Sequence, residues 1–136
     1  MVLREQNEGR PWWDWPQKLA VHNQTALGEW CQTHRDRLLE QELLQWHLSR
    51  QWTQLRELAR ELDVEILGDL PFYVARDSAD VWSHRSLFSI AADGRLREQS
   101  GVPPDYFSAT GQLWGTPVYS WPRHRSTGFR LSLIHI

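Results

Sequence analysis

The clearest periodic signal in the chain is an apolar stripe between Glu40 and Leu62. Its members recur at steps of three and four residues, the spacing of one helical face: Leu44, Leu48, Trp52, Leu55, Ala59 and Leu62. The spacing therefore predicts an amphipathic helix over residues 40–62. A second helix is predicted just before it, over Gln24–Leu39, although Gly28 lowers the helix propensity there.

A short apolar run, Val64–Leu67, follows this helix and ends at Gly68. Its length and its flanking residues are typical of a buried strand. A helix followed directly by a strand is one unit of an α/β fold, so α/β is the predicted fold class.

Local signals predict two smaller features after this strand. Ser78 is placed to cap a short helical turn that reaches Trp82. Further on, the pair Asp93-Gly94 lies between two short runs, residues 87–90 and 95–98, and predicts a β-hairpin.

Two segments lack any helical or strand period. Residues 1–23 contain Gly9, Pro11 and Pro16, and we expect an irregular segment that buries some of its three tryptophans. Residues 101–122 contain seven glycines and prolines together with Tyr106, Phe107, Trp114, Tyr119 and Trp121. So many aromatic residues argue against disorder, so a long functional loop is predicted.

Composition excludes several classes of protein. With 136 residues, the chain is shorter than the roughly 250 residues of a complete TIM barrel. Its net charge of −2 argues against nucleic-acid binding, and no apolar run is long enough to cross a membrane. One cysteine excludes an internal disulfide, and the six histidines lack metal-ligand spacing. Because the N-terminus is polar, without a secretion signal, we expect a cytoplasmic protein.

Asp69 is the first candidate for chemistry, because it follows the end of the predicted strand. In parallel α/β folds, ligands bind at the carboxyl ends of strands, where a carboxylate can accept hydrogen bonds from substrate hydroxyls. Alternatively, Asp69 caps a turn or holds Leu70-Pro71 in place. Its position alone does not decide between the two interpretations.

The second candidate is the aromatic loop. Tyr106, Phe107 and Trp114 offer flat apolar faces that could stack on a pyranose ring, while Asp105 and Gln112 could bind the ring hydroxyls. The alternative is that the aromatic side chains pack the loop against the body of the domain. Composition alone favours this alternative, because aromatic residues are usually buried.

Two long motifs carry a family resemblance. GDLPFYVARDSADVW at 68–82 and GVPPDYFSATGQLWG at 101–115 closely resemble the amylomaltases, the 4-α-glucanotransferases of glycoside hydrolase family 77. PWWDWP at 11–16 is similar to a further family stretch, and the resemblance runs from about residue 9 to residue 130. Thr116 departs from it, because asparagine is expected there in many members, which puts a sugar contact at 116 in doubt.

The resemblance implies a partial (β/α)8 barrel that contains helices, one barrel strand, a β-hairpin and a long aromatic substrate loop. It implies transfer of α-1,4-glucan segments between maltooligosaccharides by a retaining double displacement, without a cofactor or metal. The implied substrate-binding residues are Asp69, Asp105, Tyr106, Phe107, Gln112 and Trp114.

The family's catalytic carboxylates are not implied in this chain. The nucleophile lies in an R-x-D-H motif, which these 136 residues do not contain, and the other carboxylates follow it. Asp77, Asp80 and Asp105 are therefore not assigned to those roles.

The resemblance also suggests limits for the domain. Residues 1–130 are expected to form part of the catalytic barrel domain, and residues 131–136 a non-native tail. Two other functions stay open from the sequence. One is a small aromatic-rich carbohydrate-binding domain, and the other is a helical interaction module in which the tryptophans only form a core.

Overall fold

The computed structural model describes residues 2–68 and 73–131. Its elements in chain order are α1 (Val2–Gln6), η1 (Trp12–Asp14), α2 (Gln17–Ala20), α3 (Gln24–Thr33), α4 (Arg35–Glu61), α5 (Ala79–Ser83), η2 (Arg85–Leu87), β1 (Gln99–Val102), β2 (Gln112–Pro117) and α6 (Trp121–Ser126). The chain divides into two compact units. One contains α3 and α4, and the other contains the segments before α3 and after residue 72.

The two predicted helices of the first unit are present, but the boundary between them is shifted. The chain breaks at His34, whose backbone has φ −113° and ψ 26°, and α4 begins directly after it. The His34 ring stacks on Trp30 at 4.2 Å between ring centroids, and its Nδ1 lies 2.9 Å from the Trp30 carbonyl oxygen. These local contacts stabilise a boundary between the helices at His34, whereas the periodicity predicted it between residues 39 and 40.

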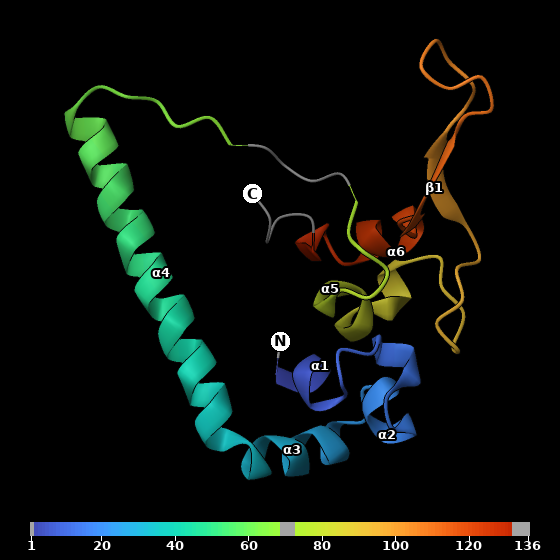
Figure 1. The fold of residues 1–136 in the computed structure, drawn as a ribbon, viewed down its shortest axis with the longest axis horizontal. Helices are drawn as coiled ribbons and strands as arrows, with labels where there is room; N and C mark the ends of the chain where they lie inside the picture. The colour runs from blue at the N-terminus through green and yellow to red at the C-terminus, as the bar shows by residue number, and fades with distance from the viewer. Residues whose placement is uncertain (1, 69–72, 132–136) are drawn as a thin grey trace. The chain divides into compact units, whose positions relative to one another are not determined.

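The helix α4 is 27 residues long and runs as one uninterrupted helix in Figure 1. Its predicted apolar stripe is present but not buried. The leucines and the tryptophan of the stripe, Leu44, Leu48, Trp52, Leu55 and Leu62, are 48–66% exposed. Helix formation therefore followed the pattern, whereas the unit formed by α3 and α4 does not itself cover the stripe.

The strand predicted over Val64–Leu67 is wrong for this chain. The helix ends with Asp63 in the left-handed region, φ 55°, and the Val64 N–H donates to the Ala59 carbonyl at 2.8 Å. This is the Schellman pattern of a helix end. Residues 64–68 then belong to no strand: the strands of the described residues are β1 and β2, and they pair with each other. The described chain thus contains helices and one two-stranded sheet, without the barrel strand.

Tryptophans form the core of the second unit, as expected for part of the N-terminal segment. Trp12 and Trp15 are buried, and each indole N–H is satisfied by a backbone carbonyl, that of Arg76 at 2.9 Å and that of Arg10 at 2.8 Å. Trp15 also meets Trp82 edge to face at 5.4 Å. The segment is less irregular than predicted, since it contains α1, η1 and α2.

The predicted cap and turn are both present around this core. The Ser78 hydroxyl accepts a hydrogen bond from the Val81 N–H at 3.3 Å and begins α5. At Asp93-Gly94 the chain turns with a single antiparallel bridge, Ile90 to Leu96, rather than two full strands. The expected hairpin is therefore confirmed only as a tight turn.

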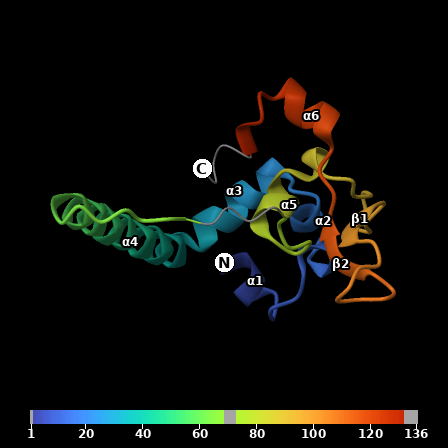
Figure 2. The same cartoon turned by 90° about the horizontal axis from the view of Figure 1, so that it is seen from above.

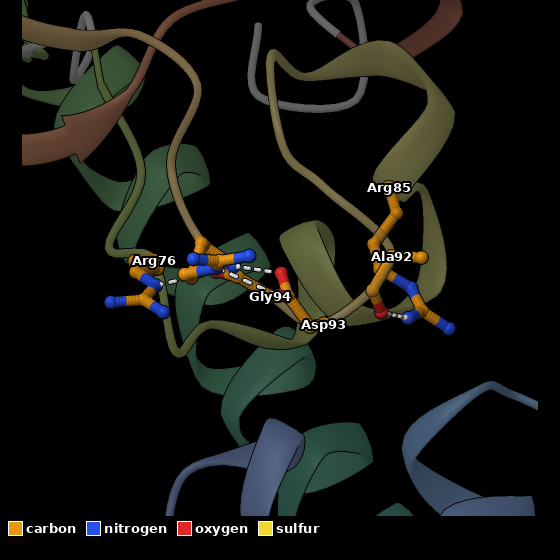
Figure 3. Close-up of polar contacts among 6 residues, drawn as sticks. Arg76, Arg85, Ala92, Asp93 and Gly94 are labelled. Carbon is orange, nitrogen blue, oxygen red and sulfur yellow. Dashed lines mark hydrogen bonds and ion pairs between the residues drawn. The ribbon is translucent and has the colours of Figure 1, made fainter.

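Polar contacts fix this turn, as Figure 3 shows: Arg76 Nε donates to the Gly94 carbonyl at 2.8 Å. The Arg76 guanidinium also lies 3.9 Å from the Trp13 ring centroid. The backbone N–H and the guanidinium of Arg95 donate to the Asp93 carboxylate, and they lower the pKa of Asp93 below its usual value. The turn is thus fixed by its own side chains and by Arg76.

The segment 101–122 is not a structureless loop, which corrects the sequence prediction. β1 and β2 form an antiparallel hairpin, visible from above in Figure 2, in which Gly101 pairs with Leu113 and Val102 with Gln112. A Cβ atom at Gly101 would clash with the Gln112 carbonyl oxygen, and one at Gly111, which has φ 74°, would lie 2.6 Å from the Val102 oxygen. Only glycine allows the two strands to approach this closely, and such strands lack the alternating pattern by which strands are recognised.

The buried side of this unit is completed by α6. His124 is fully buried among the rings of Phe88, Tyr119 and Trp121, and its Nε2 lies 3.1 Å from the Leu87 carbonyl oxygen. Phe88 also forms an isolated bridge with Tyr119. These contacts join the end of the hairpin to the core.

The exposed stripe of α4 gives a first testable prediction. The 136-residue chain is expected to bind the hydrophobic dye ANS, and Leu48→Glu should lower that binding because it places a charge in the stripe. Thr53→Glu, which introduces the same charge on the opposite face of α4, serves as the control and should leave dye binding unchanged. Equal dye fluorescence from the two variants would show that the stripe is not the binding surface.

A second prediction concerns Gly94, where a Cβ atom would lie 2.9 Å from the Trp13 Cβ and 3.0 Å from the Trp12 ring. Gly94→Ala should lower the free energy of unfolding by about 1–3 kcal/mol more than Gly9→Ala does. Gly9 is a matched control, because it also has positive φ but has no atom within 4 Å of the added Cβ. Urea unfolding followed by near-UV circular dichroism measures the difference, and equal losses would contradict the clash.

Candidate functional site

The β1–β2 hairpin positions five of the six candidate residues. Asp105, Tyr106 and Phe107 lie in the loop between the strands, and Gln112 and Trp114 lie on β2. The sixth candidate, Asp69, lies outside the described residues, so its predicted place at a strand end is not tested. The hairpin therefore carries the five residues as two groups: Gln112 contacts Trp114, and Phe107 contacts both Asp105 and Tyr106.

The Asp105 carboxylate organises the loop. Its Oδ1 accepts hydrogen bonds from the Phe107 N–H at 2.9 Å and the Ser108 N–H at 2.8 Å, while the Asp105 N–H donates to the Ser108 carbonyl at 3.0 Å. The Ser108 hydroxyl in turn donates to the Gly111 carbonyl at 2.7 Å. An aspartate that binds the backbone two and three residues ahead holds a tight turn. Among the described residues nothing donates to Oδ2, so one oxygen holds the loop and the other faces no partner there.

The rings of Tyr106 and Phe107 do not pack the loop against the described part of the domain. Tyr106 is 97% exposed and Phe107 88%, and the two rings meet edge to face at 5.6 Å between centroids. The alternative in which these two aromatics are buried is therefore wrong for the described chain. Two large apolar rings beside each other at a loop tip form a surface suited to a flat, weakly apolar ligand.

Trp114 is held more firmly than the loop rings. Its indole N–H donates to Gln112 Oε1 at 3.1 Å, and its ring meets that of Tyr73 at 5.7 Å and 67°. Trp114 is still 47% exposed, so these two contacts leave much of its surface open to solvent.

Tyr73 is the residue that sequence reasoning missed. It belongs to the motif at 68–82, whereas Trp114 belongs to the motif at 101–115, so the two motifs meet at this ring pair. The available signal was that Tyr73 lies in the same motif as Asp69. Nothing in the spacing of that motif indicated which of its aromatic residues would contact the hairpin.

The strand β2 also places Thr116. Its hydroxyl forms a short hydrogen bond with that of Ser100 on β1, and Ser100 is buried. The Thr116 hydroxyl is therefore engaged within the hairpin, in keeping with the doubt about a sugar contact at this position. Nearby, burial raises the pKa of the Tyr119 hydroxyl, and the charges of Asp80 and Tyr73 add to that rise.

A cavity of about 750 Å³ in the same unit is lined by none of these candidates. Its walls include Tyr119 and Trp121 and three arginines, Arg85, Arg97 and Arg123. Arg123 donates to the Ser86 carbonyl at 3.2 Å and Arg85 to that of Ala92 at 3.5 Å, so two of the three cations bind the walls themselves. Because this cavity contains none of the candidate residues, the hairpin and not the cavity is the candidate site.

The described residues contain no cluster of three or more His, Cys, Asp or Glu side chains that could hold a metal ion. None of the helices in residues 2–68 and 73–131 is long and apolar enough to cross a membrane.

Comparison with known proteins decides the family. The family model described as 4-alpha-glucanotransferase, glycoside hydrolase family 77, matches residues 1–133. The chain belongs to this family. The match supports the glucanotransferase interpretation over a stand-alone carbohydrate-binding domain or a helical interaction module.

Curated 4-alpha-glucanotransferases agree with this assignment. That of Aquifex aeolicus is 41% identical over 130 residues, which cover 96% of this chain and 27% of that protein. The chloroplastic/amyloplastic enzyme of Solanum tuberosum is 42% identical over 118 residues, covering 87% of this chain and 20% of its own. The chain thus spans about a quarter of the length of these relatives, and its own location in the cytoplasm stays a prediction.

The fold agrees as well. The amylomaltase from Streptococcus agalactiae, in complex with acarbose, matches with a TM-score of 0.92 and 31% identity. The match covers 100% of this chain and 28% of that one. The chain therefore has the fold of one part of an amylomaltase.

The two backbone hydrogen bonds accepted by Asp105 Oδ1 give a third prediction. Asp105→Ala should speed the amide hydrogen exchange of Phe107 and Ser108 about tenfold or more, because both N–H groups lose their acceptor, at a cost of about 1–3 kcal/mol. Asp105→Asn keeps an oxygen at the same position and should change the exchange rates much less. NMR-detected exchange of the two amides measures the effect, and equal rates in both variants would contradict the loop-holding role.

Proposed function

We propose that this chain is the glucan-binding part of a 4-α-glucanotransferase that transfers α-1,4-glucan segments between maltooligosaccharides. The observation that carries the proposal is the exposed aromatic surface of the hairpin loop, Tyr106 and Phe107, in a chain of this family. The acarbose bound to the matching Streptococcus agalactiae structure, a carbohydrate ligand, supports a sugar as the ligand here.

The proposal assigns a role to each candidate side chain. The rings of Tyr106, Phe107 and Trp114 stack on the C–H faces of glucose units, burying weakly apolar surface. The free oxygen of Asp105 accepts a hydrogen bond from a sugar hydroxyl, and the amide NH2 of Gln112 donates one.

Asp69 completes the proposed contacts near the bond that is cleaved. Its assignment rests on the family resemblance of the motif at 68–82.

The parent protein is proposed to be a (β/α)8 barrel enzyme, with residues 1–130 as part of its catalytic domain. The tail proposed for residues 131–136 lies outside the described residues except for Leu131, which is buried. Retaining transfer requires two carboxyl groups about 5–5.5 Å apart. The R-x-D-H motif of the proposed nucleophile is not within these 136 residues. Catalysis is therefore proposed for the parent and not for this chain by itself.

Closure of the loop would explain transfer rather than hydrolysis. A glycosyl group passes to a second sugar only if water is kept from the reacting centre. The segment 101–119 carries large, exposed rings at the tip of its connecting loop, which suit it to cover a bound glucan. We therefore propose that it closes on the substrate.

The fourth prediction tests this function in the full-length parent with maltotriose. The wild type should release glucose together with longer maltooligosaccharides, while the 136-residue chain alone should release neither. Trp114→Ala should reduce productive binding by about 1–3 kcal/mol, by analogy with other ring-stacking sites, and should raise hydrolysis relative to transfer.

Leu113→Ala is the matched control, since Leu113 is the neighbouring residue on β2 and points to the other face of the strand. Product analysis and thermal melting are measured on each variant. A lower melting temperature of Trp114→Ala with an unaltered ratio of transfer to hydrolysis would refute the closing loop. Absence of transfer by the wild-type parent would refute the proposed function.

A further inference from the structure

Trp114 differs from the other candidate rings because two side chains fix it. The rings of Tyr106 and Phe107 touch each other and are almost fully exposed, so either can turn on its own side chain. The indole of Trp114 is bound at its N–H by Gln112, two residues earlier on the same face of β2. Its ring is also met by Tyr73, from a segment 41 positions earlier in the sequence.

The contact with Tyr73 determines the plane of the indole. The hydrogen bond to Gln112 fixes one atom, Nε1, and the ring can still swing about that point. A second contact at 5.7 Å and 67° removes this freedom, because edge-to-face pairs hold the angle between two rings. Tyr73 is 38% exposed, so one side of the ring pair stays accessible to a ligand.

We infer that Tyr73 is a positioning residue, which sets the Trp114 ring at the angle in which it stacks on a glucose unit. The inference rests on the proposed function and extends it to a residue outside the aromatic loop. Stacking on a flat ligand is sensitive to the angle of the ring, so a ring held in advance loses less freedom on binding. Tyr73 thereby links the motif at 68–82 to the substrate surface of the hairpin.

In this inference the aromatic ring of Tyr73, and not its hydroxyl, positions Trp114. Tyr73→Leu removes the aromatic edge and should lower kcat/KM for maltotriose in the full-length parent roughly 3- to 10-fold, chiefly through KM. Tyr73→Phe keeps the ring and should restore wild-type values. A role of the hydroxyl as a sugar ligand would instead make Tyr73→Phe as impaired as Tyr73→Leu, and that result would overturn the inference.

A double-mutant cycle separates positioning from a general effect on folding. If Tyr73 acts through Trp114, then Tyr73→Leu should cause no further loss of kcat/KM in the Trp114→Ala background. Equal losses in the two backgrounds would overturn the inference, because Tyr73 would then act independently of the indole. Melting temperatures of all variants accompany the kinetics, and Leu113→Ala serves as the unaltered control.

The outcomes also separate this inference from the function on which it rests. A wild-type parent that transfers glucan, with Tyr73→Leu as active as the wild type, overturns the positioning role alone. A wild-type parent without transfer overturns the proposed function, and the inference with it.

Discussion

The unit that bears the hairpin depends on the burial of Trp12. Its indole occupies the core, and its N–H reaches the Arg76 carbonyl, 64 residues away in sequence. That one hydrogen bond joins the N-terminal segment to the segment that carries Tyr73. Because a buried indole N–H without an acceptor is costly, the position of the Arg76 backbone is set by the tryptophan.

The position of Arg76 in turn fixes the neighbouring segments. Arg76 lies against Trp13 and donates to Gly94, so the turn at Asp93 is fixed to the same core. The chain leaving that turn becomes β1, whose partner β2 carries Trp114. A rigid core of tryptophans thus supports a hairpin whose tip is exposed, as expected for a binding loop on a stable scaffold.

The elements that sequence reasoning predicted are those with local causes. Ser78 caps α5 through its own hydroxyl, and α4 follows its apolar period regardless of what covers it. The failures have non-local causes. Val64–Leu67 was predicted to be a strand, but a strand exists only with a neighbour, and the described chain supplies none to it. The β1–β2 hairpin was missed because its pairing depends on glycines in close approach, which give no alternating pattern.

The sequence predicted which residues form the candidate site, but not the contacts that they make. The motif indicated the residues of the loop, and the structure gathers Asp105, Tyr106 and Phe107 at the hairpin tip. That one oxygen of Asp105 binds the backbone, and that Trp114 meets Tyr73, are contacts that depend on the turn and on the core. No spacing in the sequence encodes them.

The close approach at Gly101 and Gly111 has a consequence for how this site can diversify. Both glycines are fixed by backbone atoms of the opposite strand, so the two ends of the loop cannot accept a side chain. The residues between them touch mostly one another, through Asp105, Ser108 and the paired rings. The segment 103–110 can therefore vary in sequence while the strand register, and the core beneath it, stay unchanged. If the loop binds glucan as proposed, such changes would alter the sugar chain that it prefers.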